Sequence, residues 1–264
     1  MSQTARTAVA IVAVVILAII GWLVLRGGGE ETAPPPEPTA TPVVATPTPS
    51  LADQLSERLR GVTIGTSDAV VRELVSELSA RPELAKWLAS DDLVRRFVAS
   101  VNNVAEGTSP KTHLEFLRPS EPFVVEERGD RLVIDPRSWQ RYDTVADVVT
   151  SLDTEGTVAL YRELEPLMVG AHREIAPPDV TFRERLDAAF TALLAVPVPD
   201  RPIEVEPKVV TYSYTDATLE GLTGAQRQFL RMGPDNVRRV QEKLREIRAE
   251  LERVEDASAA EVVE

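Results

Sequence analysis

Residues 229–251 read "FLRMGPDNVRRVQEKLREIRAEL", and the periodicity of this stretch decides how the rest of the fold is interpreted. Gly233 is placed to end one helix and Pro234 to begin the next. Apolar residues then recur at spacings of three and four, at Val237, Val240, Leu244, Ile247, Leu251 and Val254. Acidic and basic side chains surround this apolar seam in near balance. We therefore predict a helix that packs on its own domain or, alternatively, self-associates with another copy, rather than a nucleic-acid-binding surface.

The composition of the 264 residues disfavours several classes of site. A net charge of −13 repels phosphate backbones, so we expect no nucleic-acid partner. The absence of cysteine removes disulfides, thiol nucleophiles and cysteine-based zinc sites. The two histidines, His113 and His172, do not stand in an HExxH arrangement, and we expect each to be a solvent-facing or packed side chain. We therefore predict neither a metal site nor a cofactor.

The N-terminal segment has the length and composition of a membrane span. Residues 7–25, "TAVAIVAVVILAIIGWLVL", contain no charge and nearly match a hydrocarbon core of about 30 Å at 1.5 Å per residue. The run exceeds the apolar region of a signal peptide, so an anchor in the lipid bilayer is favoured over a cleaved leader. The charges on either side favour a cytoplasmic N-terminus at residues 1–6.

Residues 26–50 differ in composition from both neighbouring segments. They include "GGGEETAPPPEPTATPVVATPTPS", which is rich in proline and threonine and has little that can pack. Such proline density favours extended polyproline II conformation, and we predict a disordered linker that acts as a spacer. The Pro35-Pro36-Glu37-Pro38 stretch matches a PxxP ligand pattern, which any proline-rich spacer contains by chance.

Residues 51–252 read as a single, mainly α-helical domain with a minor β element, followed by an acidic C-terminal tail at 253–264. Thr66 or Ser67 is expected to cap a first helix, and Ser90, Asp91 and Asp92 to cap the helix that extends towards Gly107. Further helices are predicted at 82–88, 142–152, 154–174, 182–195 and 224–232. Residues 123–134 predict a β-hairpin around Gly129 and Asp130, and residues 203–214 predict one or two short strands.

Aromatic and acidic residues gather in two short stretches, "DPRSWQRYD" and "TYSYTD". We predict a partner or ligand surface from Asp135, Trp139, Tyr142, Asp143, Tyr212 and Tyr214. Aromatic faces beside carboxylates suit sugars or peptide groups, and paired carboxylates can hydrolyse glycosidic bonds. The alternative is that the rings are core and the acids are caps. Ser67 also lies in a Gly-x-Ser-x-Ala frame, but no partner set for a nucleophilic serine follows it.

Several stretches in order along the chain resemble the bacterial domain-of-unknown-function family 3014. They are "DDLVRRFVASVNNVAEG" (91–107), "FLRPSEPF" (116–123), "IDPRSWQRYD" (134–143), "SLDTEGTVALYRELEPL" (151–167) and "QRQFLRMGPDNVRRVQEKLREI" (226–247). The resemblance implies a membrane-anchored bacterial protein with a proline-rich spacer and an envelope-facing domain. It implies no reaction and brings no catalytic residues.

The sequence thus leads to one principal functional hypothesis. We expect a single-pass protein of the bacterial inner membrane, with a periplasmic helical domain that binds an envelope protein or a cell-wall component without catalysing a reaction. The alternatives are a cell-wall hydrolase that uses Asp135, Asp143 or Asp216, and self-association through the C-terminal helix.

Overall fold

A computed structural model describes residues 50–209 and 211–261 of the chain. The predicted span 7–25 and residues 26–49 of the predicted linker lie outside these residues. Within the described ranges, no helix is both long enough and apolar enough to cross a membrane. The anchor therefore stays a prediction.

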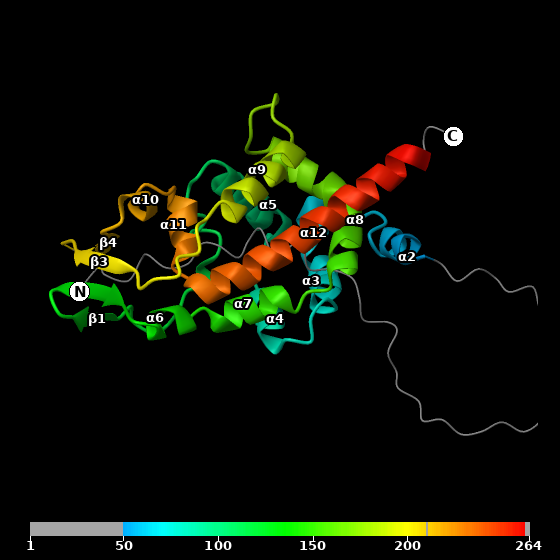
Figure 1. Cartoon of the computed structure of the whole chain (residues 1–264). Coiled ribbons are helices and arrows are strands. Elements are labelled where there is room, and N and C mark those ends of the chain that lie inside the picture. Colours follow the sequence, from blue (N-terminus) through cyan, green and yellow to red (C-terminus); the bar gives the residue numbers. More distant parts are fainter. Residues whose placement is uncertain (1–49, 210, 262–264) are drawn as a thin grey trace, which may run out of the picture.

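The described chain is mainly helical, with a small antiparallel sheet (Figure 1). The first elements are α2 (Leu51–Arg58), η1 (Ile64–Thr66), α3 (Asp68–Ser76), α4 (Pro82–Trp87), α5 (Leu93–Ala105) and η2 (Glu115–Leu117). The central elements are β1 (Val125–Arg128), β2 (Arg131–Ile134), α6 (Arg137–Gln140), α7 (Asp143–Thr150), α8 (Thr154–Arg173) and α9 (Phe182–Leu194). The last are β3 (Glu204–Pro207), β4 (Tyr212–Tyr214), α10 (Ala217–Glu220), α11 (Gly224–Leu230) and α12 (Pro234–Glu261).

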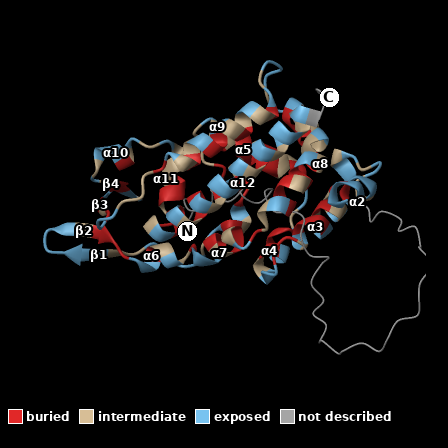
Figure 2. Cartoon of the chain, turned by 45° about the vertical axis from the view of Figure 1, so that its right-hand side comes forward, coloured by how far each residue is buried: buried red, intermediate tan, exposed pale blue. Residues whose placement is uncertain are grey.

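The core lies where α5, α8, α9 and α12 pack together, with α7 against α12. Figure 2 shows the buried residues concentrated on the sides where these helices meet. The residues of the α12 seam from Val237 to Leu251 are each at most 3% exposed. The prediction that this face packs on its own domain is therefore confirmed, and the seam is already covered within one chain.

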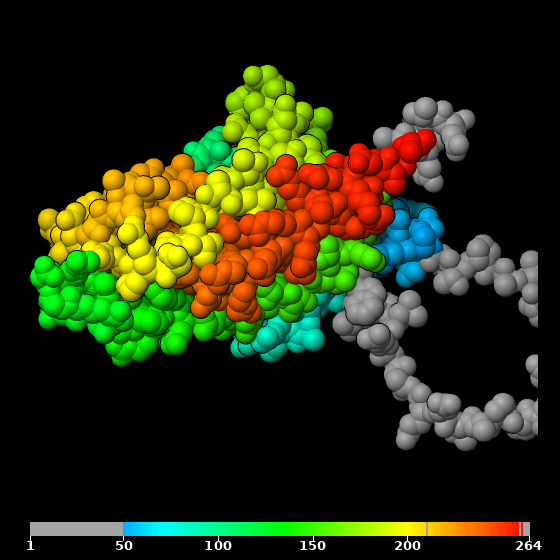
Figure 3. Space-filling view, viewed as in Figure 1, coloured from blue at the N-terminus to red at the C-terminus, as the bar shows by residue number. Residues whose placement is uncertain are grey.

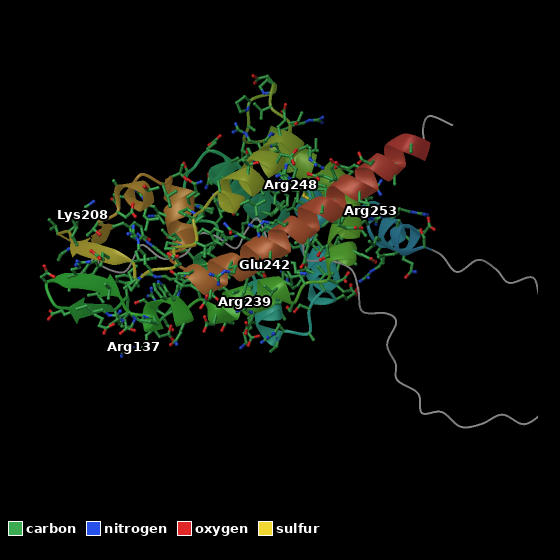
Figure 4. All side chains as sticks on the ribbon, in the orientation of Figure 1. Arg137, Lys208, Arg239, Glu242, Arg248 and Arg253 are labelled. Carbon is green, nitrogen blue, oxygen red and sulfur yellow. The ribbon has the colours of Figure 1, made fainter. Side chains whose placement is uncertain are left out.

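The charged sides of α12 face solvent or neighbouring acids. Arg239 contacts Asp147 of α7 at 2.6 Å, and Arg183 of α9 pairs with Glu255. Figure 4 shows Arg239, Glu242, Arg248 and Arg253 in succession along this helix. These pairs confirm the mixed-charge helix predicted from the sequence, since a basic and an acidic residue of α12 each pair with the opposite charge on a neighbouring helix.

The sheet lies at one end of the molecule, opposite α2 (Figure 1). Its order is β1-β2-β3-β4 with antiparallel pairs throughout. Gly129 has φ +67°, a left-handed conformation that favours glycine, and it joins β1 to β2 in the predicted hairpin. The strands around Pro207 are also confirmed. The pairing of β2 with β3 connects segments that are about seventy residues apart, which no local pattern predicted.

Two predicted helix caps are wrong. The Ser67 hydroxyl does not cap α3 and instead donates to the Ile64 carbonyl. Asp92 precedes α5 with φ 57° and makes no side-chain cap. Asp68 caps α5 from α3, because its carboxylate accepts from the amides of Asp92 at 2.7 Å and Leu93 at 2.9 Å.

The structure also adds elements that the sequence did not indicate. α6 and α10 have only four residues each, too few for a helical periodicity to show. α12 continues through Glu261, so residues 253–261 of the segment expected as a tail are helical. Figure 3 shows α12 as a diagonal ridge on one face, with the α8–α9 loop protruding beside it.

Candidate functional site

The six residues predicted as a partner surface all lie towards the sheet end of the molecule. The structure divides them by role rather than gathering them in one cleft. Asp135 follows β2, Trp139 belongs to α6, and Asp143 begins α7. Tyr142 joins α6 to α7, and Tyr212 and Tyr214 are the ends of β4.

Asp135 is held by its neighbour Arg137. Its carboxylate accepts from the Arg137 amide at 2.8 Å and from Arg137 Nη2 at 2.6 Å. These side-chain and backbone hydrogen bonds from Arg137 lower the pKa of Asp135. The carboxylate is therefore ionised and occupied in fixing the turn from β2 into α6.

Trp139 and Asp143 hold the start of α12. A Cβ added to Gly233 would lie 2.6 Å from Trp139 Cβ, so the indole packs directly on the glycine backbone. Buried Asn236 donates through Nδ2 to Asp143 Oδ1 at 2.8 Å. Both predicted residues thus contact the start of α12, and Asp143 is at the same time exposed to solvent.

Tyr142 and Tyr214 are inner members of the aromatic group. Tyr142 is 4% exposed, and its side chain is hydrogen-bonded to Gln228 of α11. Burial raises the pKa of Tyr142 and that of Tyr214, while the positive charge of nearby Arg231 acts on both in the opposite direction. These two hydroxyls therefore stay neutral.

Tyr212 forms the exposed part of the group together with Phe123, which the sequence interpretation did not select. The two rings lie 5.5 Å apart with their planes tilted by 48°. Tyr212 is 39% exposed and Phe123 is 36% exposed. β1 and β4 are the two edge strands of the sheet. Phe123 lies two residues before β1, so the ring contact brings the segment before one edge strand against the other edge strand.

Arg141 lies against the Phe123 ring of this pair and was also missed. Its guanidinium carbon is 5.7 Å from the centre of the Phe123 ring and 5.5 Å from that of Tyr142. Nε donates to the Ser138 carbonyl at 2.8 Å, and Nη1 donates to the Glu121 carbonyl at 2.9 Å. We call Phe123, Arg141 and Tyr212 the aromatic–arginine patch.

The carboxylates considered for hydrolysis have separate structural partners. Asp216 caps α10 through the Thr218 amide and pairs with Arg201 at 2.8 Å. With Asp135 on Arg137 and Asp143 on Asn236, no hydrogen bond joins any two of the three acids in residues 50–209 and 211–261. The arrangement does not support paired acid–base chemistry.

His172 is a packed side chain, which is one of the two environments that we predicted for it. It is 3% exposed, with Nε2 placed 2.9 Å from the Val180 carbonyl and Nδ1 placed 3.1 Å from Asn102 Nδ2. Nε2 donates to the carbonyl and Nδ1 accepts from the amide, so the ring links α8 to the segment before α9 and to Asn102 of α5. Among the described residues, no group of three or more histidine or acidic side chains is arranged to hold a metal ion.

A family model described as "Protein of unknown function (DUF3014)" matches residues 93–248. The chain belongs to the DUF3014 family. No curated protein and no solved structure matches it. The DUF3014 match confirms the resemblance seen in the sequence, while the membrane anchor that was implied with it lies outside the described residues.

The DUF3014 region contains the complete aromatic–arginine patch and the core helices α5, α8 and α9. Helices α2, α3 and α4 precede it, yet they pack into the same core and supply Asp68 to cap α5. The folded unit therefore extends beyond the matched residues at its N-terminal side.

Proposed function

We propose that this DUF3014 protein is a membrane-anchored binding module of the bacterial envelope and that its sheet end contacts a partner protein or cell-wall component. The observation that carries the proposal is the exposed contact between Phe123 and Tyr212. Large apolar rings that pack on each other at the surface mark interaction sites more often than isolated exposed residues do.

The separate duties of the nearby acids favour binding over catalysis. Asp135, Asp143 and Asp216 stabilise a turn, a helix start and a helix cap, respectively. The predicted span 7–25 and spacer 26–50 support the envelope setting, because a proline-rich spacer of this length can hold a domain well away from a bilayer.

Photo-crosslinking in intact cells tests the binding proposal. A photoreactive amino acid is placed at Val209, which is fully exposed near Tyr212, in the full-length chain. We expect a discrete crosslinked species that disappears when Phe123 and Tyr212 are both changed to Ala. The matched control, Glu242→Ala on exposed α12, should leave the species unchanged. A crosslinking pattern that is the same in the double variant and in the control contradicts the proposal.

Protease access tests the envelope setting separately. In spheroplasts, the domain should be digested by added protease while residues 1–6 stay protected. Protection of the domain in intact spheroplasts, with digestion only after lysis, would contradict a periplasmic location.

A further inference from the structure

Arg141 has an electrostatic environment unlike that of the arginines paired with acids. Hydrogen bonds donated to carboxylates are the first cause of a raised pKa at Arg58, Arg95, Arg128, Arg131, Arg137 and Arg253. Burial instead lowers the pKa of Arg141. This guanidinium is thus partly removed from water without a carboxylate bound to it.

The distances around Arg141 also show that no carboxylate is bound to its guanidinium. In residues 50–209 and 211–261, no carboxylate oxygen lies within 4.0 Å of a side-chain nitrogen of Arg141, which is the distance of an ion pair. Its two named hydrogen bonds go to backbone carbonyls, which carry no net charge. The negative charge of Glu121 acts on Arg141 from beyond ion-pair distance, and the positive charge of Arg231 opposes it. The Arg141 guanidinium is therefore without an ion-pair partner among the described residues, although the whole chain carries a net charge of −13.

The rings around Arg141 determine which apolar groups of a negatively charged ligand can pack beside the guanidinium. Tyr142 covers one part of the guanidinium from within, and Phe123 with Tyr212 forms an exposed apolar edge. The exposed rings are tilted by 48°, so they do not form the flat platform on which a sugar ring stacks. Phenylalanine, tyrosine and arginine are also the residue types that are enriched in the centres of protein interfaces.

We propose that the aromatic–arginine patch recognises a carboxylate on an extended segment of a partner protein. The Asp or Glu carboxylate of the segment lies on the Arg141 guanidinium, and a neighbouring proline or aromatic residue packs on Phe123 and Tyr212. Arg141 suits this role because the backbone carbonyls of Ser138 and Glu121 fix Nε and Nη1, which leaves Nη2 to donate a charge-assisted hydrogen bond to a carboxylate. This inference rests on the proposed binding function and specifies the chemistry of the partner.

A peptide array provides a direct probe. The purified full-length chain in detergent is applied to an array of random twelve-residue peptides, and a strongly bound peptide is then measured in solution. We expect the bound peptides to be enriched in Asp or Glu next to proline or an aromatic residue. Replacing the acid of the selected peptide with its amide should weaken binding at least tenfold. No acidic enrichment, or equal binding of the amide form, overturns the inference without depending on any protein variant.

Protein variants then identify the binding residue. Arg141→Gln should weaken binding of the acidic peptide at least tenfold and leave binding of its amide form within about twofold. Arg141→Lys, which keeps the positive charge and replaces the planar guanidinium by an ammonium, should give an intermediate loss. The matched control is Arg137→Gln on the neighbouring α6, whose guanidinium pairs with Asp135, and it should bind within about twofold of the natural chain.

The outcomes separate this inference from the proposed function. If the Phe123 and Tyr212 double variant loses binding while Arg141→Gln keeps it, the sheet end is a binding surface and the carboxylate specificity is wrong. If neither change affects binding of the selected peptide, both proposals fail.

Discussion

The helical core and the sheet end use the same residue types in opposite ways. In the core, the ring centres of Phe97 and Phe182 lie 5.8 Å apart, and both residues are at most 5% exposed. At the sheet end, Phe123 and Tyr212 contact each other at 5.5 Å while more than a third of each stays exposed. Core burial contributes to stability, whereas exposed rings leave apolar surface that a partner can cover.

Arginine differs between the two regions in a parallel way. Arg239 of α12 pairs with Asp147, so its charge is neutralised within the domain. Arg141 lies among rings and carbonyls without an ion-pair partner in the described chain. We therefore expect substitutions in the core to change stability, and substitutions in the patch to change binding.

The largest effect is expected from Phe97→Ala. This removes a buried ring between α5 and α9 and should lower the free energy of unfolding by about 3–5 kcal/mol. Urea denaturation followed by circular dichroism measures the change. A loss below about 1 kcal/mol would mean that this part of the core is not packed as described.

Leu244→Ala should be nearly as costly, because Leu244 is 0% exposed in the α12 seam. We expect a loss of about 2–5 kcal/mol in the same denaturation experiment. Glu242→Ala, on the exposed side of the same helix, should stay within about 0.5 kcal/mol. Equal effects of the two substitutions would show that α12 does not pack by this face.

Gly233→Ala examines the joint between the two regions. Gly233 has φ +84°, and a Cβ there meets the Trp139 side chain of α6. Gly129→Ala is the matched control, because φ is +67° and no atom lies within 4 Å of the added Cβ. The control should cost about 1–2 kcal/mol from backbone strain alone. Gly233→Ala should exceed it by about 1–3 kcal/mol because of overpacking, and equal costs would exclude the close Trp139 contact.

Asp68→Ala removes the carboxylate that caps α5. We expect a loss of about 0.5–2 kcal/mol, as for other N-cap removals. Asp91→Ala changes an exposed acid just before α5 that makes no cap bond, and it should be close to neutral. If thermal unfolding shows a larger loss of stability for Asp91→Ala than for Asp68→Ala, the cap of α5 is Asp91 and not Asp68.

Apart from the control variants, the smallest effect on stability is expected from Phe123→Ala. Because the ring is 36% exposed, the loss should be below about 1 kcal/mol, although the same change weakens binding of the array-selected peptide. Comparison with Phe97→Ala uses the same substitution in both regions. If Phe123→Ala destabilises the chain as much as Phe97→Ala does, the ring is a core residue and the distinction between the regions fails.

Local patterns predicted most elements correctly, but not the contacts that complete the site. The spacing of apolar residues from Val237 to Leu251 predicted the buried face of α12, since helix geometry alone brings these residues to one side. Tyr142, Tyr212 and Tyr214 were also selected. Phe123 and Arg141 were missed, although both stand in stretches that carry the family resemblance, because only the packing of the segment before β1 against the end of α6 brings them together.

Three of the residues that the sequence did select show the same limit of local patterns. Asp135, Trp139 and Asp143 were selected as possible ligand contacts because of their proximity in sequence to other aromatic residues. Their actual partners are Arg137, Gly233 and Asn236, and the last two lie about ninety residues away. Spacing along the chain could not distinguish a support for α12 from a ligand contact.

The sequence by itself determined the helical class, the hairpin at Gly129 and the apolar face of α12, because backbone preferences and side-chain periodicity act over a few residues. It also provided the prediction of an anchor and spacer before residue 51. The tertiary structure alone decided that Asp68 caps α5, that β2 pairs with β3, and that Arg141 lies between rings without a carboxylate. These features depend on long-range packing, which brings together groups that have no relation in sequence.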